Sequence, residues 1–67
     1  MAEQTAHILR KILIIDDEEK LRTLLARIIS LEGFEVLQAG DCKTALKKLE
    51  QNDIDVALCD VKLPDGN

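Results

Sequence analysis

Residues 11–36 read KILIIDDEEKLRTLLARIISLEGFEV, and this stretch decides the fold. Its first five residues form a β-branched apolar run, which is too short for a helix and fits a strand buried on both faces. The run stops at four acidic residues. After them, apolar residues recur at helical spacing: Leu21, Leu24, Leu25, Ile28 and Ile29. The stretch therefore predicts a buried strand followed by an amphipathic helix over residues 18–32.

Both ends of this helix carry the signals that a helix end requires. Acidic residues in the first turn suit the positive end of the helix dipole. Gly33 follows Glu32 directly and fits a left-handed C-terminal cap, with Phe34 as its apolar follow-on contact. Residues 34–38 (FEVLQ) then predict a short second strand.

The rest of the chain repeats the alternation of strand and helix. Gly40 predicts a turn, and Asp41 is a favourable N-cap for a second amphipathic helix, which residues 51–53 end. Residues 54–59 (IDVALC) predict a third strand. The order β-α-β-α-β indicates the α/β class, in which strands joined by helices run parallel with right-handed crossovers. We expect one domain over residues 11–67 and a flexible arm over residues 1–10.

Composition narrows the class of protein further. The chain has 67 residues, of which 46% are hydrophobic and 33% are charged, as is typical of a soluble globular domain. Apolar runs stay far below the ~20 residues of a spanning helix, and the leader lacks a signal-peptide core, so we expect a cytoplasmic location and no membrane contact. The net charge of −4, without a basic stripe, argues against nucleic-acid contact by this segment.

Cysteine and histidine content gives no sign of a metal-binding or disulfide scaffold. Cys42 and Cys59 are expected to be reduced thiols, since a chain with a cytosolic composition seldom forms disulfides. His7 is the single histidine, which disfavours a Cys/His zinc site.

Carboxylates follow two of the predicted strands at once. Asp16 and Asp17 follow the first strand, and Asp60 follows the third. If these strands are neighbours in a parallel sheet, the three acids converge at the carboxyl edge, where open α/β sheets bind their ligands. Clustered carboxylates repel one another unless a hard cation neutralises them, and an all-oxygen site suits Mg²⁺. The pattern therefore predicts a magnesium site.

The same cluster suits phosphoryl chemistry. A phosphoryl group at such a metal has its oxygens partly neutralised, so that a nearby carboxylate can attack phosphorus. Asp60 is the better nucleophile candidate, and the Asp16–Asp17 pair is the better metal holder. Each part has an ordinary explanation, since acidic runs cap helices and residues 63–66 (LPDG) form a common turn. The combination is more specific than any of its parts.

From residue 11 to residue 67 the sequence resembles the N-terminal half of a two-component response-regulator receiver domain. The features that match are the acid pair, the GFEV stretch before and in the second strand, the Ala-Leu second helix, and the stretch DVKLPDGN after the third strand. The resemblance implies a flavodoxin-like (CheY-like) fold with parallel strands in the order 2-1-3. It implies that Asp60 is the phosphoacceptor, that Asp16 and Asp17 bind Mg²⁺ with it, and that the backbone carbonyl of Lys62 completes the metal site.

The resemblance also implies partners. The phosphoryl donor would be a histidine kinase, and the receiver would regulate an output, expected to be transcription. Residues 63–67 are similar to NtrC-type regulators, which carry an ATPase domain acting on the alternative sigma factor (sigma-54). We expect a phosphoacceptor signalling domain rather than an enzyme in the usual sense, although the parent protein would catalyse its own phosphoryl transfer and hydrolysis.

A complete receiver of this family has further β-α units after the third strand. We therefore expect the 67 residues to be a truncated piece. They would lack the hydroxyl residue after strand 4, the lysine after strand 5 and the aromatic switch residue, and would not be competent in signalling by themselves.

Two other functions fit parts of the pattern. One is a self-associating structural half-domain without signalling activity. In the order 2-1-3 the third strand lies at an edge, and residues 54–59 contain no Pro, Lys or bulge signal, so a homo-oligomer through this strand is expected. The other is a haloacid-dehalogenase-like phosphatase fragment. That family has a second Asp two residues after its nucleophile, a spacing that Asp16 and Asp17 lack.

Overall fold

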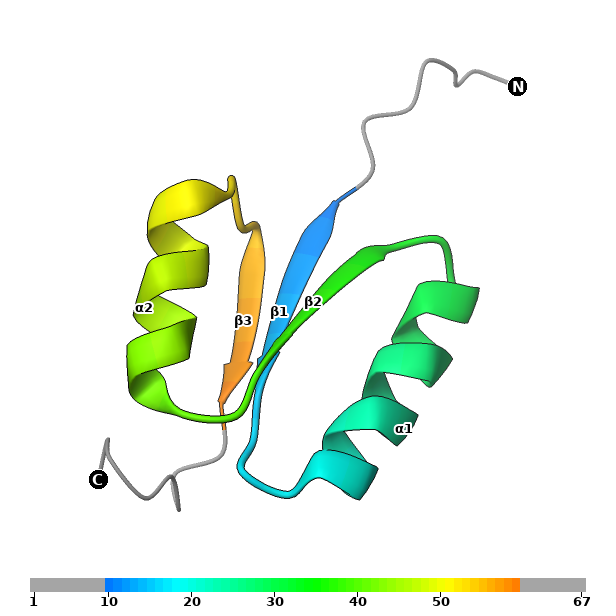
Figure 1. Ribbon diagram of the computed structural model, residues 1–67. Coiled ribbons are helices and arrows are strands. Elements are labelled where there is room, and N and C mark those ends of the chain that lie inside the picture. The colour runs from blue at the N-terminus through cyan, green and yellow to red at the C-terminus, as the bar shows by residue number, and fades with distance from the viewer. Residues whose placement is uncertain (1–9, 60–67) are drawn as a thin grey trace.

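A computed structural model describes residues 10–59, which form a three-stranded sheet with one helix on each face (Figure 1). The elements in chain order are β1 (Lys11–Ile15), α1 (Glu19–Leu31), β2 (Glu35–Ala39), α2 (Cys42–Gln51) and β3 (Val56–Cys59). All strands are parallel, in the order β2-β1-β3. The predicted class, element order and strand order are confirmed. Nearly all of the predicted arm lies outside the described residues, as do Asp60 and Lys62.

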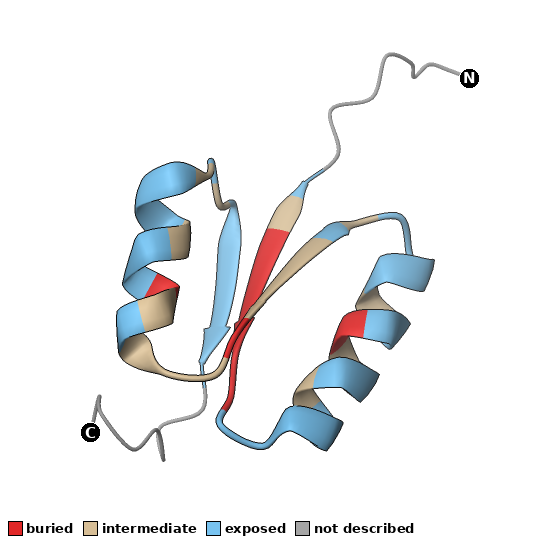
Figure 2. Cartoon of the chain, in the orientation of Figure 1, coloured by how far each residue is buried: buried red, intermediate tan, exposed pale blue. Residues whose placement is uncertain are grey.

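The central strand β1 is buried on both faces, as the KILII run predicts. Leu13 and Ile15 pack on the face covered by α2, and Ile12 and Ile14 pack on the face covered by α1. Figure 2 shows the buried residues gathered on this strand, with few on the helices. Successive side chains of a strand point to opposite faces, so a strand between two helices needs apolar residues at every position.

Helix α1 is one residue shorter at each end than predicted, because Glu18 is its N-cap and Glu32 its C-cap. Gly33 has a φ of +99°, which confirms the predicted left-handed residue after the helix. Its N–H donates to the carbonyl of Ser30 at 3.0 Å. Phe34 then packs against the apolar cluster on the α1 face. Strand β2 begins and ends one residue later than predicted.

Strand β3 begins at Val56, two residues later than predicted. The N–H of Ile54 donates to the carbonyl of Asn52 at 3.1 Å, which closes a tight turn after α2. Asp55 then bonds Lys11 twice: its N–H donates to the carbonyl of Lys11, and its carboxylate accepts the Lys11 N–H at 2.7 Å. These contacts bring the chain into register before the strand starts.

The outer edge of β3 confirms the predicted edge position. All four of its residues are exposed, and neither helix contacts the strand within the described part of the chain. Both helices pack on β1 and β2 instead. Between residues 10 and 59 there is no helix whose length and apolar character would let it cross a membrane.

Asp41 caps α2 as predicted, and its carboxylate accepts the Thr44 N–H at 2.7 Å. This backbone hydrogen bond is the main reason that the pKa of Asp41 lies below its ordinary value of 3.8, followed by a bond from the Thr44 side chain. A lowered pKa in the folded state stabilises the protein above the ordinary pKa, and that stabilisation is lost as the pH falls through the lowered value.

We therefore expect Asp41→Ala to lower Tm at neutral pH, and the difference from wild type to shrink below pH 3.8. Thermal melts at several pH values measure this. Asp41→Asn is the matched control, because asparagine also caps helices but does not titrate. A difference between wild type and Asp41→Ala that stays constant down to strongly acidic pH would contradict the role given to the carboxylate.

Candidate functional site

The candidate site lies at the carboxyl edge of the sheet, where the strands end level with one another. Ile15, the last residue of β1, is paired with Ala39 of β2 and with Cys59 of β3. The next residue along each strand is therefore Asp16, Gly40 or Asp60. Asp60 and Lys62 lie outside the described residues, so the convergence of Asp60 with the acid pair stays a prediction.

Asp16 is a buried charged residue at this edge, with 6% of its surface exposed. Its N–H donates to the carbonyl of Ala39 at 3.0 Å. Its carbonyl accepts Arg22 Nη1 at 2.8 Å, and its Oδ1 accepts the Glu18 N–H at 2.9 Å. Bonds to its N–H, its carbonyl and its side chain thus hold the residue, so that the direction of the carboxylate is set by the loop.

The carboxylate of Asp16 fits a cation. Within residues 10–59, the Glu18 N–H is its one hydrogen-bond partner, and it forms no ion pair. A buried charge of this kind is normally paired with an opposite charge or coordinates a metal. Asp17 follows directly and is exposed to solvent. Together they offer two carboxylates, and Mg²⁺ typically takes one or two carboxylates and keeps several waters.

The described residues alone do not make a larger metal centre. Residues 10–59 contain no group of three or more His, Cys, Asp or Glu side chains that could hold a metal ion. The third acid of the predicted site is Asp60, so the full ligand set remains a prediction. Of the four predicted ligands, Asp16 and Asp17 lie within the described residues.

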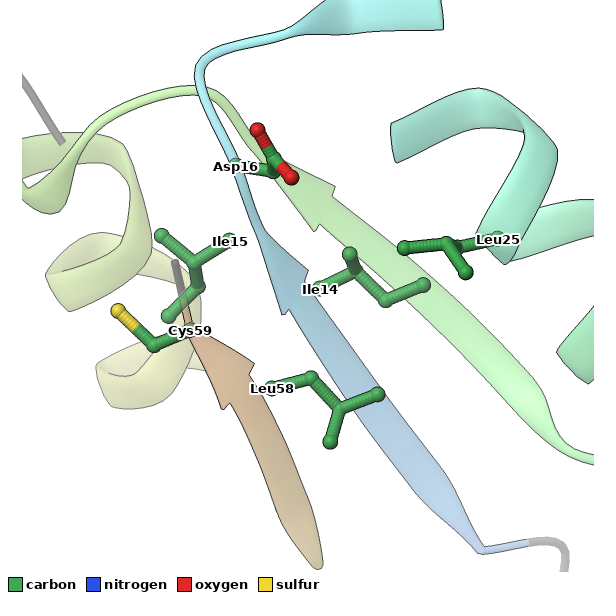
Figure 3. Close-up of a pocket in the computed structure, with 6 residues that line it drawn as sticks. All are labelled: Ile14, Ile15, Asp16, Leu25, Leu58 and Cys59. Atoms are coloured by element: carbon green, nitrogen blue, oxygen red, sulfur yellow. The ribbon is translucent and has the colours of Figure 1, made fainter. Parts of the chain in front are cut away.

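An open pocket of about 200 Å³ lies beside Asp16 (Figure 3). Its lining is apolar apart from this aspartate and comprises Ile14, Ile15, Asp16, Leu25, Leu58 and Cys59. Ile14 and Leu58 are neighbours across β1 and β3, and Leu25 comes from α1. The pocket is therefore the gap between α1 and β3, where no described helix covers the outer strand.

Arg22 is the residue of this site that the sequence did not predict. Helical periodicity gave it no role beyond a place off the apolar stripe, yet it is half-buried and bonds both Asp16 and Gln38. A signal was present, because side chains of a helix lean toward its N-terminus. A long arginine in the first turn can therefore reach back to the preceding loop.

Comparisons with known proteins agree on one family. The family model described as response regulator receiver domain matches residues 12–67. The CAI-1 autoinducer sensor kinase/phosphatase CqsS of Vibrio cholerae is 40% identical over 55 residues, which are 82% of this chain and 8% of that protein. The alkaline phosphatase synthesis transcriptional regulatory protein PhoP of Bacillus subtilis is 44% identical over 55 residues, which are 82% of this chain and 23% of that protein.

A third relative, the transcriptional regulatory protein CpxR of Escherichia coli, is 41% identical over 59 residues, which are 88% of this chain and 25% of that protein. The chain thus spans a quarter or less of the length of these relatives. No solved structure matches the chain.

Proposed function

Because the chain belongs to the response regulator receiver domain family, we propose that it is the phosphoacceptor module of a two-component signalling system. The phosphoryl donor is a histidine kinase, and the acceptor is Asp60. A carboxylate oxygen of Asp60 attacks phosphorus, the bond from phosphorus to the kinase histidine breaks, and an acyl phosphate forms. The family match carries this proposal, since it spans Asp16, Asp17 and Asp60.

Asp16, Asp17, Asp60 and the backbone carbonyl of Lys62 would hold Mg²⁺. When bound, the ion neutralises charge on the phosphoryl oxygens. Asp16 contributes a carboxylate that accepts the Glu18 N–H, on a residue whose backbone N–H and carbonyl are both hydrogen-bonded. Fixed ligands lose little freedom on binding, which favours a site that must be ready before the phosphoryl group arrives.

The output of the whole protein is proposed to be regulation of transcription, as the names of two relatives suggest. The NtrC-type subgroup, a cytoplasmic location and the absence of nucleic-acid contact by this segment stay predictions. The 67-residue chain by itself is proposed to lack signalling competence.

Self-association is a second proposed property of this chain, and a specific observation favours it. Within the described residues the outer edge of β3 is unpaired, Val56 and Leu58 are 46% and 43% exposed, and neither helix packs on the strand. An apolar strand with an unpaired edge tends to pair with another chain. We propose a homodimer of the 67-residue chain through β3.

The metal site can be tested by titration. Adding Mg²⁺ to the isotope-labelled chain should first shift the amide NMR signals at Asp16, Asp17 and Asp60, because their carboxylates surround the ion. Binding is expected to be weak. The double variant Asp16→Asn/Asp17→Asn should abolish these shifts. Asp53→Asn, at an exposed acid after α2, is the matched control and should keep them. Shifts confined to other parts of the chain would overturn the assignment.

A further inference from the structure

Resting on the proposed function, we infer that Arg22 is a positioning residue, which fixes the Asp16 carboxylate for a divalent cation. Its guanidinium joins three elements at the carboxyl edge of the sheet. Nη1 donates to the carbonyl of Asp16 at 2.8 Å, and Nε donates to Oε1 of Gln38 at 3.0 Å. The side chain comes from α1, Gln38 belongs to β2, and Asp16 begins the loop after β1.

Arg22 bonds Asp16, whose backbone is also held on its other side. The N–H of Asp16 is held by Ala39 on β2, and its carbonyl is held by Arg22. With both peptide groups fixed, the carboxylate meets the Glu18 N–H at 2.9 Å. Loss of Arg22 would release the carbonyl and let the peptide between Asp16 and Asp17 rotate. Both acids of the pair would then change direction.

Gly40 gives independent support, because this glycine makes room for the guanidinium. A Cβ atom at Gly40 would lie 2.9 Å from Arg22 Nη1, closer than real contacts allow. Among residues 10–59, Gly33 is the glycine with a left-handed φ, so the backbone does not require glycine at position 40. The turn after β2 thus accommodates the arginine that holds the loop after β1.

The charge of Arg22 and its role in positioning Asp16 predict opposite effects on cation affinity when the arginine is removed. Removing a positive charge near the acid pair should strengthen cation binding if charge alone matters. Removing a positioning group should weaken it, since partners that orient metal ligands typically change metal affinity by about 10- to 100-fold. The sign of the change therefore separates the two roles.

The test compares Mg²⁺ dissociation constants, measured from amide NMR shifts at Asp16 and Asp17, in wild type and in variants of the full chain. Arg22→Met should weaken binding by about tenfold. Gly40→Ala should also weaken binding, by less than Arg22→Met does, because it shifts the flexible end of the arginine while keeping its charge. Arg27→Met is the matched control, since it removes an exposed arginine of the same helix and should change binding by less than about twofold.

A second measurement needs no metal and does not depend on activity. The amide proton of Glu18 reports its bond to Asp16 Oδ1, and its NMR signal should move upfield in Arg22→Met and Gly40→Ala but not in Arg27→Met. Thermal melts check that each variant is folded. If Arg22→Met does not fold, Gly40→Ala provides the comparison with wild type. Lysine donates from a single point rather than a planar fork, so Arg22→Lys should lie between wild type and Arg22→Met.

The outcomes are distinct. Unchanged or tighter Mg²⁺ binding in folded Arg22→Met and Gly40→Ala, with an unmoved Glu18 signal, overturns the inference and leaves the proposed function intact. If wild type shows no shift at Asp16 or Asp17 on adding Mg²⁺, the metal part of the proposed function fails, and this inference fails with it.

Discussion

The 67-residue chain alone is expected to take up little or no stable phosphate from acetyl phosphate, whereas a longer polypeptide that continues through the remaining strands of the family should be phosphorylated on Asp60. The described residues supply the carboxyl edge of the sheet and both members of the acid pair that the resemblance assigns to Mg²⁺. They supply no lysine or hydroxyl side chain that the resemblance places at the phosphoryl oxygens. Losing a single donor to developing oxyanion charge typically costs about 10²–10³ in rate.

Intact-mass spectrometry after incubation with acetyl phosphate and Mg²⁺ measures this difference. Asp60→Asn in the longer polypeptide should abolish uptake, because an amide cannot act as the nucleophile. Asp53→Asn is a control that removes a different exposed acid and should leave uptake unchanged. Stoichiometric phosphorylation of the 67-residue chain would show that the later residues are not needed for transfer.

Much of the fold could be predicted because local signals and the burial pattern agree. Four consecutive apolar residues in β1 require cover on both faces, and each face received one helix. Gly33 and Asp41 ended and began their helices as their chemistry demands. The strand order had a different origin, since periodicity cannot order parallel strands. It came from the family resemblance, and the pairing of β1 with both neighbours confirms it.

The site was less predictable because its geometry depends on contacts between distant segments. The sequence pattern gave Arg22 no role, since helical periodicity reports which face is apolar and not how far a long side chain reaches back. Its second partner, Gln38, lies 16 positions along the chain and comes near only when β2 pairs with β1. Gly40 was taken for a turn glycine, whereas its small size is what this site uses. The start of β3 likewise depended on the long-range bonds between Asp55 and Lys11.

Replacing Leu58 with lysine is expected to convert the 67-residue chain from a homodimer to a monomer. Leu58 is 43% exposed and Val56 is 46% exposed, both on the outer strand and on the face that α1 covers only over β1 and β2. The edge carries no charged side chain between residues 56 and 59 that would discourage pairing. Two such edges can therefore bond through their backbones and bury these side chains together.

Symmetry determines how the edges pair. A twofold axis makes the two copies of β3 equivalent, and an antiparallel ladder satisfies that condition, whereas a parallel ladder offsets its hydrogen bonds. Two three-stranded sheets would then form one sheet in the order 2-1-3-3-1-2, with the two acidic sites directed toward opposite ends. In a longer chain a following strand of the domain would take the same edge, so this dimer belongs to the 67-residue chain.

Sedimentation velocity at micromolar concentration measures the mass in solution. In a symmetric dimer Leu58→Lys introduces one lysine from each copy into the interface, and like charges brought together in an interface cost several kcal/mol, on the order of a hundredfold or more in dissociation constant. Val56→Lys should act in the same direction.

Leu31→Lys is the matched control, since Leu31 is 80% exposed at the end of α1, away from β3, and its change should leave the dimer intact. A wild-type chain that sediments as a single monomeric species with well-dispersed NMR signals would rule out the dimer. A dimer that only Leu31→Lys dissociates would place the contact on α1 instead.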